Sequence, residues 1–371
     1  MHPFFDFLLY TLYVAVFIQS IYYVFIFSRF PKKSNKGSFH EKPKVSVIIC
    51  AKNEAQNLYN NLPLVLSQNF PNFEVVLIND ASSDNTLEVM EDFKKQHANI
   101  KIVDVKSVEA FWGNKKYALT LGIKAASSNY LLFTDADCWP VSNQWINQMC
   151  LSFRQDKEII LGFSPYKKIK GSFLNLLIRF ETFLTALQYF SYANIGQPYM
   201  AVGRNFAYKK ALFFEANGFI NHIKLQSGDD DLFVNQMANK NNTSWCISSE
   251  SFVESQPKAS FREWINQKRR HISTSKFYKP RHKILLGLFY TSQLLFWMCM
   301  ILLGLANHFW QMVLVVVMFR FCLQYLVYYQ SAKKLGETDL LYLLPLTEFV
   351  LVIFQFFIFI INLIVRPKHW K

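Results

Sequence analysis

Long apolar segments near both ends of the chain limit most strongly what it can fold into. Residues 4–27 contain only one charged side chain, Asp6. Three further apolar runs lie at residues 284–305, 309–329 and 340–364. A helix of about 20 apolar residues crosses the roughly 30 Å hydrocarbon core of a bilayer. We therefore predict one N-terminal and three C-terminal transmembrane helices, the last of which is either continuous or broken at Pro345.

Residues 4–27 could instead form a secretory signal peptide, but their context favours an anchor. The run lacks a basic start and is longer than the apolar region of a signal peptide. The segment that follows, from Ser28 to Lys33, is basic and contains no small-residue cleavage site. We interpret residues 28–43 as a basic linker between the anchor and the next domain.

The positive charge of the chain is placed beside the apolar runs. The formal net charge is +14. Basic residues follow the first run and precede the second, at Arg29, Lys32, Lys33, Lys36, Lys268, Arg269, Arg270, Lys276, Lys279, Arg281 and Lys283. Such flanks are typical of the cytoplasmic side of a membrane. We expect a protein of the cell inner (cytoplasmic) membrane with its middle domain in the cytoplasm, and no nucleic-acid partner, because the basic residues form no recognisable nucleic-acid-binding motif.

The side of the C-terminus stays open at this stage. Four spans around a cytoplasmic domain would place both termini outside, whereas the basic tail from Arg366 to Lys371 favours the inside. An interfacial piece before the last span, or a re-entrant turn, would remove the conflict. Arg320 lies within an apolar run, and we expect it to face other helices or an interface because its exposure to lipid is costly.

The segment from residue 44 to residue 137 alternates short β-branched runs with polar helical stretches. Strands are predicted at residues 45–50, 75–78, 100–103 and 130–133, and helices at residues 54–68, 85–96 and 115–126. This alternation predicts an α/β fold with a mainly parallel sheet flanked by helices. Ligands of such sheets bind beyond the carboxyl ends of the strands.

Acidic residues follow the predicted strands at that edge. Glu54 follows the first strand, and Asp80, at the end of the second, can accept hydrogen bonds from a base or a ribose. Asp135 and Asp137 follow the fourth strand, and side chains two residues apart in an extended segment point the same way. Two such carboxylates can hold Mg²⁺ or Mn²⁺, because hard cations prefer oxygen ligands. Lys115 lies on a helix that could reach a phosphate.

Two later segments also carry chemistry. Asp229, Asp230 and Asp231 follow Gly228, and three adjacent carboxylates raise one another's pKa, which suits a general base. We expect Asp231 simply to begin a helix. Farther on, Gln267, Arg270 and His271 share one helix face, where amide and guanidinium donors could bind a leaving diphosphate.

Taken in order, these segments resemble the family 2 glycosyltransferases. That family includes cellulose, hyaluronan and poly-N-acetylglucosamine synthases, dolichol-phosphate sugar synthases and ceramide glucosyltransferase-like enzymes. The resemblance covers residues 44–275, the expected glycosyltransferase domain. It rests on Val47–Glu54, Ile78–Thr86, Gly113–Leu119, Thr134–Cys138, Gly203–Tyr208, Gly228–Asp230 and Gln267–His271.

The resemblance implies a GT-A-like domain, a nucleotide-sugar donor and a role for each candidate residue. Asp230 stands where the family has its catalytic base, with Asp229 as the alternative. Asp135 and Asp137 match the metal motif for Mg²⁺ or Mn²⁺. The donor, a UDP-sugar by this resemblance, is expected to meet Glu54, Asp80, Lys115, Asp135, Gln267, Arg269 and Arg270. Asn205 and His271 are expected on the acceptor side.

One departure from the family pattern bears on the product. His271 stands where the membrane synthases have a Trp that stacks on the acceptor sugar, which puts polymer extension in doubt. We therefore expect inverting transfer of a sugar to a lipid-linked or glycan acceptor, with processive polysaccharide synthesis coupled to secretion as the alternative. A catalytically silent membrane scaffold is disfavoured by the intact acids. The sugar, the acceptor and the oligomeric state are left open.

Overall fold

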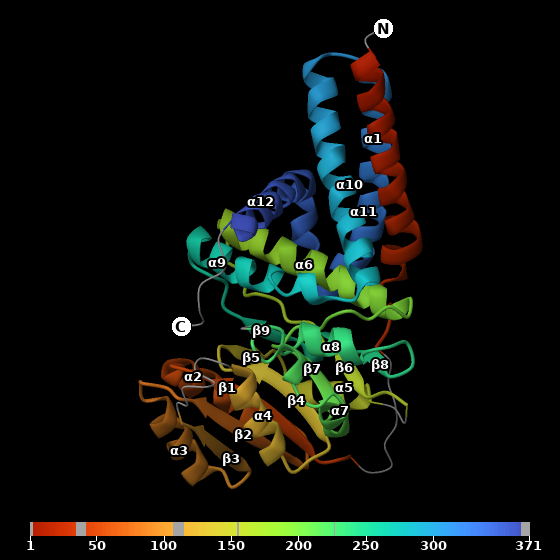
Figure 1. The fold of residues 1–371 in the computed structure, drawn as a ribbon. Coiled ribbons are helices and arrows are strands. Elements are labelled where there is room, and N and C mark those ends of the chain that lie inside the picture. The colour runs from red at the N-terminus through yellow and green to blue at the C-terminus, as the bar shows by residue number, and fades with distance from the viewer. Residues whose placement is uncertain (1–2, 35–41, 107–114, 154–155, 226, 365–371) are drawn as a thin grey trace.

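The structure is a computed structural model that describes residues 3–34, 42–106, 115–153, 156–225 and 227–364. Figure 1 shows an α/β domain, a layer of helices lying across it, and a group of long helices standing on that layer. The predicted fold class is confirmed. The C-terminal basic tail and the Gly113-Asn114 pair lie outside the described residues.

The central sheet has seven strands in the order β3-β2-β1-β4-β7-β6-β8. Strands β1 (Val45–Ala51), β2 (Phe73–Asp80), β3 (Ile100–Val105) and β4 (Tyr130–Asp135) are parallel to one another. The sheet continues antiparallel through β7 (Phe206–Lys209) to β6 (Ile159–Leu161), which pairs in parallel with β8 (Thr243–Trp245). Parallel strands buried on both faces are continuously apolar, as the sequence of β1 is.

Helices cover both faces of this sheet. Helices α2 (Ala55–Leu66), α3 (Thr86–Gln96) and α5 (Trp145–Leu151) contribute to the core on one face, and α4 (Lys115–Ala125) contributes to the core on the other. The predicted helices in this part end within two residues of the observed ones. The shorter elements α7 (Lys210–Glu215) and α8 (Asp231–Met237) follow, and β5 (Cys138–Pro140) pairs with β9 (Val253–Ser255) in a separate sheet.

A buried helix that the sequence analysis did not predict separates the sheet from the long helices. Helix α6 (Phe173–Asn194) has 22 residues and lies across the domain beside α9 (Phe261–Ile272) (Figure 1). Its phenylalanines Phe180, Phe183 and Phe190 are fully buried, and the Tyr189 hydroxyl donates to the Gly162 carbonyl at 2.7 Å. This layer attaches the catalytic sheet to the apolar part of the molecule.

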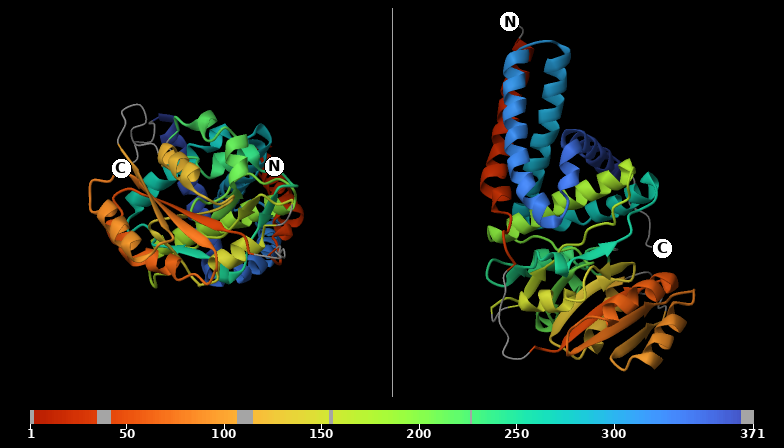
Figure 2. Two further views of the ribbon diagram at one scale, coloured as in Figure 1. Left: turned by 90° about the horizontal axis from the view of Figure 1, so that it is seen from below. Right: turned by 180° about the vertical axis from the view of Figure 1, so that it is seen from behind.

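Within the described residues, four helices are long and apolar enough to cross a membrane, by length and composition. Three stand side by side: the N-terminal helix, Pro3–Arg29, which begins with α1 (Pro3–Ile21), α10 (Pro280–Leu305) and α11 (Trp310–Leu335) (Figure 2). Arg320 on α11 is fully buried among them, as expected. Its guanidinium pairs with Glu348 and donates to Gln19 at 2.8 Å and to Gln324 at 2.6 Å.

The last helix, α12 (Leu344–Ile364), is not parallel to these three. Figures 1 and 2 show it oblique to them and low, over α6 and α9. The segment before α12 is bound to α6, because Arg179 of α6 donates hydrogen bonds to Glu337 and Asp339. The end of α12 is tied to α9, since the Arg269 Nε donates to the Asn362 amide oxygen at 3.0 Å. A helix of 21 residues is about 30 Å long. Contacts near both ends hold α12 against α6 and α9.

Pro345 does not break α12. It lies in the first turn, where proline is tolerated because that backbone N–H has no helical partner, and the change of direction occurs in the preceding 3₁₀ helix η7 (Thr338–Leu343). Of the arrangements that the sequence left open, the structure favours a re-entrant one, in which the chain after α11 turns back before it crosses the membrane again.

We predict from this arrangement that the C-terminus lies on the same membrane face as the α/β domain. Epitopes inserted after Ala98, in the turn before β3, and after Lys371 should become antibody-accessible in the same vesicle orientation. An epitope after Met1 should become accessible only in the opposite orientation, because α1 separates it from the domain. If the Lys371 epitope instead appears with the Met1 epitope, α12 crosses the membrane completely.

Candidate active site

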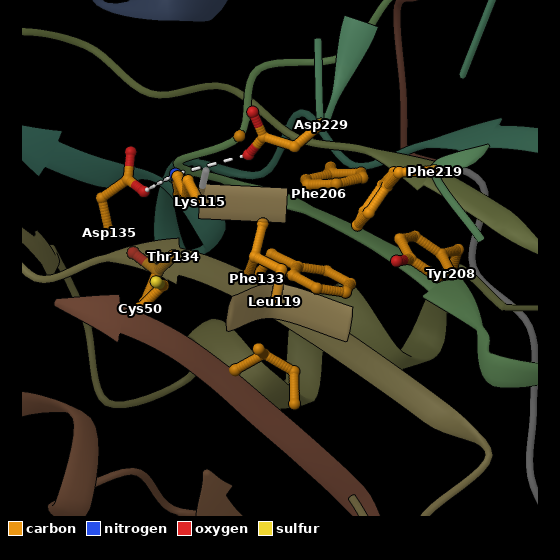
Figure 3. A pocket seen from close by; sticks show the side chains of 12 residues that line it. Cys50, Lys115, Leu119, Phe133, Thr134, Asp135, Phe206, Tyr208, Phe219 and Asp229 are labelled. Carbon is orange, nitrogen blue, oxygen red and sulfur yellow. Dashed lines mark hydrogen bonds and ion pairs between the residues drawn. The ribbon is translucent and has the colours of Figure 1, made fainter. Parts of the chain in front are cut away.

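Charged side chains gather where the carboxyl ends of β1, β2 and β4 meet. Lys115, the first residue of α4, places its Nζ 2.9 Å from Asp135 Oδ1 and 3.4 Å from Asp229 Oδ2 (Figure 3). Burial alone would lower the pKa of Lys115, but Asp135 and Asp229 raise it well above its usual value. The lysine is therefore charged and joins two acids that lie 94 positions apart in the sequence.

Aromatic rings lie beneath this ion cluster. Phe133 of β4 is stacked on Phe206 and Tyr208 of β7, with ring centroids 4.8 and 4.7 Å apart. Together with Phe219 they line the inner end of the same pocket (Figure 3). Interactions between charges are stronger beside such a low-dielectric wall than in water. The pocket thus combines a polar mouth with a dry apolar floor.

Asp135 and Asp137, the predicted metal ligands, lie close together, but not because they share an extended segment as expected. Strand β4 ends at Asp135, and Asp137 lies in the turn before β5 rather than in an extended segment. Ligand atoms of Asp135, Asp137 and Cys138 still lie within 4.8 Å of one another. Burial raises the pKa of the Cys138 thiol well above its usual value, and its Sγ donates to Asp137. The two carboxylates therefore form an oxygen site that suits a hard divalent cation.

Two further predicted acids border this group. Asp80 ends β2 and is buried, and burial raises its pKa while Lys52 and Lys115 oppose the shift. Glu54 precedes α2, and burial raises its pKa; the hydrogen bond from Asn57 opposes this shift, and the charges of Asp137 and Asp135 add to it.

Asp84, in the turn after β2, has a structural role. Its carboxylate accepts hydrogen bonds from the backbone N–H groups of Thr86 and Ala55 at 3.0 and 3.3 Å. These bonds join the turn after β2 to the start of α2. Because the carboxylate is used in this way, Asp84 shapes the rim of the site rather than offering a free ligand.

The acids after Gly228 are positioned by backbone amides. Gly228 has φ of +102°, and a Cβ there would lie 2.5 Å from Leu232 Cδ1, so only glycine fits this turn. Asp230 is the N-cap of α8: one carboxylate oxygen accepts from the Asp231 N–H at 2.7 Å and the other from the Gly203 N–H at 2.5 Å. Both oxygens are thereby held in one orientation.

The neighbouring acids differ in protonation. Burial raises the pKa of Asp230 to about 8, with Asp229 and Asp231 adding to the shift. Burial would also raise the pKa of Asp229, but Lys115 lowers it below the usual value. Asp231 accepts from the Thr274 and Tyr278 hydroxyls, so it anchors the start of α8 as a structural residue. The pair Asp229 and Asp230 thus contains one firmly ionised carboxylate and one that titrates near neutrality.

The predicted site residues of α9 point in two directions. Gln267 Nε2 donates to the Tyr166 hydroxyl at 3.4 Å. Burial lowers the pKa of Arg270, and Asp229 and Asp135 oppose that shift, which places its guanidinium within reach of their charge. Arg269 instead points to Asn362 of α12, and His271 is exposed. The structure therefore brings Gln267 and Arg270 to the site and directs Arg269 away from it.

The expectation that Asn205 faces the acceptor is corrected. Asn205 is fully buried, its amide oxygen accepts from Trp145 Nε1 at 3.0 Å, and its amide nitrogen donates to the Phe163 and Ser251 carbonyls at 2.7 and 2.8 Å. Both the oxygen and the nitrogen of its side-chain amide are thus bonded inside the domain. It holds the segment 203–205 in place and cannot itself contact a substrate.

Arg204, its neighbour, is a site residue that the sequence reasoning missed. Its guanidinium lies 4.2 Å above the Tyr166 ring and donates to the Ser164 carbonyl at 3.2 Å. Burial would lower its pKa, but Tyr166, Cys138, Asp137 and Asp135 raise it. Its place directly after Gly203 was a signal, but nothing in the sequence indicated that β7 would lie beside β4.

Comparisons with known proteins agree with this geometry. Residues 46–217 match the model of glycosyl transferase family 2. A poly-β-1,6-N-acetyl-D-glucosamine synthase of Staphylococcus epidermidis is 37% identical over 141 residues, which are 37% of this chain and 33% of the relative. Residues 46–217 therefore form a family 2 glycosyltransferase domain. An uncharacterised glycosyltransferase of Haemophilus influenzae is 29% identical over 147 residues, which are 40% of this chain and 42% of the relative.

A solved structure extends the likeness of fold to almost the whole glycosyltransferase. A mannosyltransferase of Pyrobaculum calidifontis, solved in complex with GDP-mannose and Mn²⁺, superimposes with a TM-score of 0.61 at 15% identity. It covers 93% of this chain, and this chain covers 98% of it. The match with the synthases, by contrast, spans only about a third of their length.

Proposed function

We propose that this glycosyltransferase moves a sugar from a nucleotide diphosphate sugar, a UDP-sugar, to a lipid-linked or glycan acceptor, with inversion at the anomeric carbon. The observation that carries the proposal is the meeting of Lys115 with Asp135 and Asp229 at the carboxyl edge of the sheet. A candidate phosphate-binding group thereby lies beside a candidate metal ligand and one of the two candidate bases.

The donor would lie along the carboxyl ends of β1, β2 and β4. Asp80, at the end of β2, and Glu54, directly before α2, would offer carboxylates to the base and ribose. Lys115, Gln267 and Arg270 offer donors to the diphosphate. Arg269 is left out of this set because it binds Asn362.

Asp135 and Asp137 would hold Mg²⁺ or Mn²⁺. Their carboxylates converge, and the Mn²⁺ in the Pyrobaculum enzyme of the same fold supports the choice of a divalent ion. A bound cation would neutralise charge on the diphosphate. Lys115, already between Asp135 and Asp229, supplies a second positive charge on the same side.

The chemical step is a single displacement. Asp230 accepts the proton of the acceptor hydroxyl, and the hydroxyl oxygen forms a bond to the anomeric carbon from the face opposite the diphosphate. The bond from that carbon to the diphosphate oxygen breaks, and its electron pair leaves with the nucleotide diphosphate, which Lys115, Gln267 and Arg270 stabilise. One displacement inverts the anomeric configuration. The Gly203 and Asp231 amides hold Asp230 while this occurs.

Two products are compatible with this chemistry, and different observations favour each. The poly-N-acetylglucosamine synthases among the relatives favour processive polysaccharide synthesis. The described three-helix group is filled by Leu12, Phe296 and Arg320, and His271 replaces the stacking Trp, which favours addition of a single sugar. We take single addition as the proposed activity and processive synthesis as the second candidate.

The proposal places the reaction at the cytoplasmic face of the cell inner membrane. Three helices, Pro3–Arg29, α10 and α11, would span the bilayer, α12 would enter it only in part, and α6 and α9 would lie between the bilayer and the sheet. Nucleotide sugars are made in the cytoplasm, so a donor site on the other face would contradict the proposal.

The decisive experiment identifies the product. Purified enzyme in lipid nanodiscs would be incubated with a panel of UDP- and GDP-sugars and a membrane lipid extract, and the products analysed by mass spectrometry. One added hexose or N-acetylhexosamine mass supports single addition, and a ladder of such masses supports processive synthesis. Absence of transfer and of donor hydrolysis across the panel would refute the proposed function.

We predict that Asp230→Asn and Asp80→Asn fail in different ways. Asp230→Asn should keep donor binding but lower turnover by about 10²–10⁴-fold, because it removes the proton acceptor. Asp80→Asn should weaken donor binding by about ten- to a hundredfold, the usual worth of a hydrogen bond to a charged group. Calorimetric donor binding and initial rates, measured in the same detergent, separate the two effects.

Asp92→Asn is the matched control for these substitutions, since Asp92 is exposed on α3 and pairs only with Lys95 among the described contacts. It should leave both quantities unchanged. A fully active Asp230→Asn variant beside an inactive Asp229→Asn variant would assign the base to Asp229. Two active variants would refute the displacement mechanism.

Removal of divalent ions should abolish transfer. Treatment with a chelator is expected to stop the reaction, and added Mn²⁺ or Mg²⁺ should restore it in the wild type but not in Asp137→Ala. Thermal unfolding with and without Mn²⁺ gives a second readout, because only a protein with an intact site gains stability from the ion. Full activity in chelator would contradict the assignment of Asp135 and Asp137.

The pH profile should distinguish the two candidate bases. Asp230 accepts a proton only when ionised, and its raised pKa leaves it mostly protonated below about 8. With Asp230 as base, kcat/KM should rise by about tenfold per pH unit below that value and level off above it. The lowered pKa of Asp229 predicts a flat profile across neutrality if Asp229 is the base. Donor binding over the same pH range is the control.

A further inference from the structure

Lys116 is a buried charged residue that the proposed reaction does not use. It is the second residue of α4, its side chain is 1% exposed, and it is not among the residues that line the pocket that Lys115 enters. Its Nζ donates three hydrogen bonds, to the carbonyl oxygens of His222 and Leu225 at 2.8 Å each and of Ser227 at 2.7 Å. An ammonium group has three donors, and here each has a carbonyl acceptor.

The three carbonyls belong to the loop that leads directly into the acidic segment. Ser227 is followed by Gly228, whose φ of +102° turns the chain, and then by Asp229 and Asp230. Lys116 therefore fixes the backbone within three residues of the proposed base. On the far side of the acids, the Gly203 amide and the start of α8 hold Asp230.

The free-energy cost of burying the Lys116 ammonium group indicates that this residue has a specific role. Burial lowers the pKa of Lys116 to about 8, and the charges of Asp229, Asp231 and Asp230 oppose the shift. Burying an ammonium group is costly unless hydrogen bonds replace its water. A methionine or leucine would fill the same space at lower cost, so what the lysine adds is the attachment of three backbone carbonyls to α4.

We propose that Lys116 is a positioning residue that holds the backbone at His222, Leu225 and Ser227 so that Asp230 is correctly placed for proton transfer. The proposal rests on the function proposed above. Adjacent lysines then have separate tasks: Lys115 joins Asp229 to Asp135 across the pocket, and Lys116 fixes the chain that carries Asp229 and Asp230. Because both lysines begin one helix, a single element sets the distance between the metal pair and the base.

The test compares Lys116→Met with Lys124→Met in the full-length enzyme in detergent. Methionine keeps most of the volume of lysine and removes all three donors. Lys124 is exposed on the same helix, so its replacement controls for loss of a lysine from α4. We expect Lys116→Met to lower kcat by about 10²-fold, the scale expected for a catalytic group displaced by about 1 Å. Donor affinity should change less than about threefold, since Asp80, Asp135 and Asp137 lie outside the loop.

A double variant shows whether Lys116 acts through Asp230. If it does, Lys116→Met should slow Asp230→Asn by less than about threefold, because the base that it positions is already absent. An unchanged kcat for folded Lys116→Met, or a further 10²-fold loss in the double variant, would overturn the proposal. A fully active Asp230→Asn variant is a different result, since it would refute the proposed base itself.

Folding is monitored separately by thermal unfolding and size-exclusion chromatography. If Lys116→Met does not fold, Lys116→Gln replaces it, because glutamine retains two N–H donors without the charge. Folded Lys116→Gln with an activity between Lys116→Met and wild type, or below wild type where only it folds, supports positioning. If neither variant folds, Lys116 is required for the fold and the positioning role is overturned.

Discussion

The charge balance around Lys115 is the constraint on which the rest of the site depends. Asp80, Asp135, Asp137, Asp229 and Asp230 approach one another at one edge of the sheet, and like charges in a partly buried space repel strongly. Lys115 offsets this repulsion by pairing with one acid from β4 and one from the distant loop. The same pairing separates the two candidate bases, because it keeps Asp229 ionised and leaves Asp230 to bind a proton.

The helical layer connects this charge balance to the membrane helices. Helix α9 carries Gln267 and Arg270 on the side of the site, while its Trp264 is stacked on Phe354 of α12 with ring centroids 4.2 Å apart. The bond between Arg269 and Asn362 holds the same pair of helices farther along. Because α12 is in turn bound to α11 through Glu348 and Arg320, the position of Gln267 and Arg270 depends on apolar segments that lie far from the sheet.

The sequence was sufficient for those parts of the fold that depend on local pattern. The parallel strands β1 to β4 and helices α2 to α4 were predictable because apolar runs and polar helices alternate there, and Asp80 and Asp135 were found as strand ends. Helix α6 was missed because it is buried on most sides and so lacks the one-sided pattern of a surface helix. Asn205 was misplaced because the motif around it does not reveal which side chains point inward. Arg204 and Lys116 could not be found, since their roles arise from β7 and from the His222 loop, which only the tertiary fold brings beside them.

The oblique course of α12 explains why the composition of the C-terminal region was ambiguous. The segment is apolar enough to span a bilayer, yet it contains Glu348 and ends at Asn362, whose polar groups need partners. A straight span could satisfy Glu348 through Arg320 but would carry Asn362 away from Arg269. An oblique helix satisfies both, and it keeps Trp264 covered. Partner groups, rather than hydropathy alone, therefore decide the path of this helix, and the same contacts secure α9 over the site.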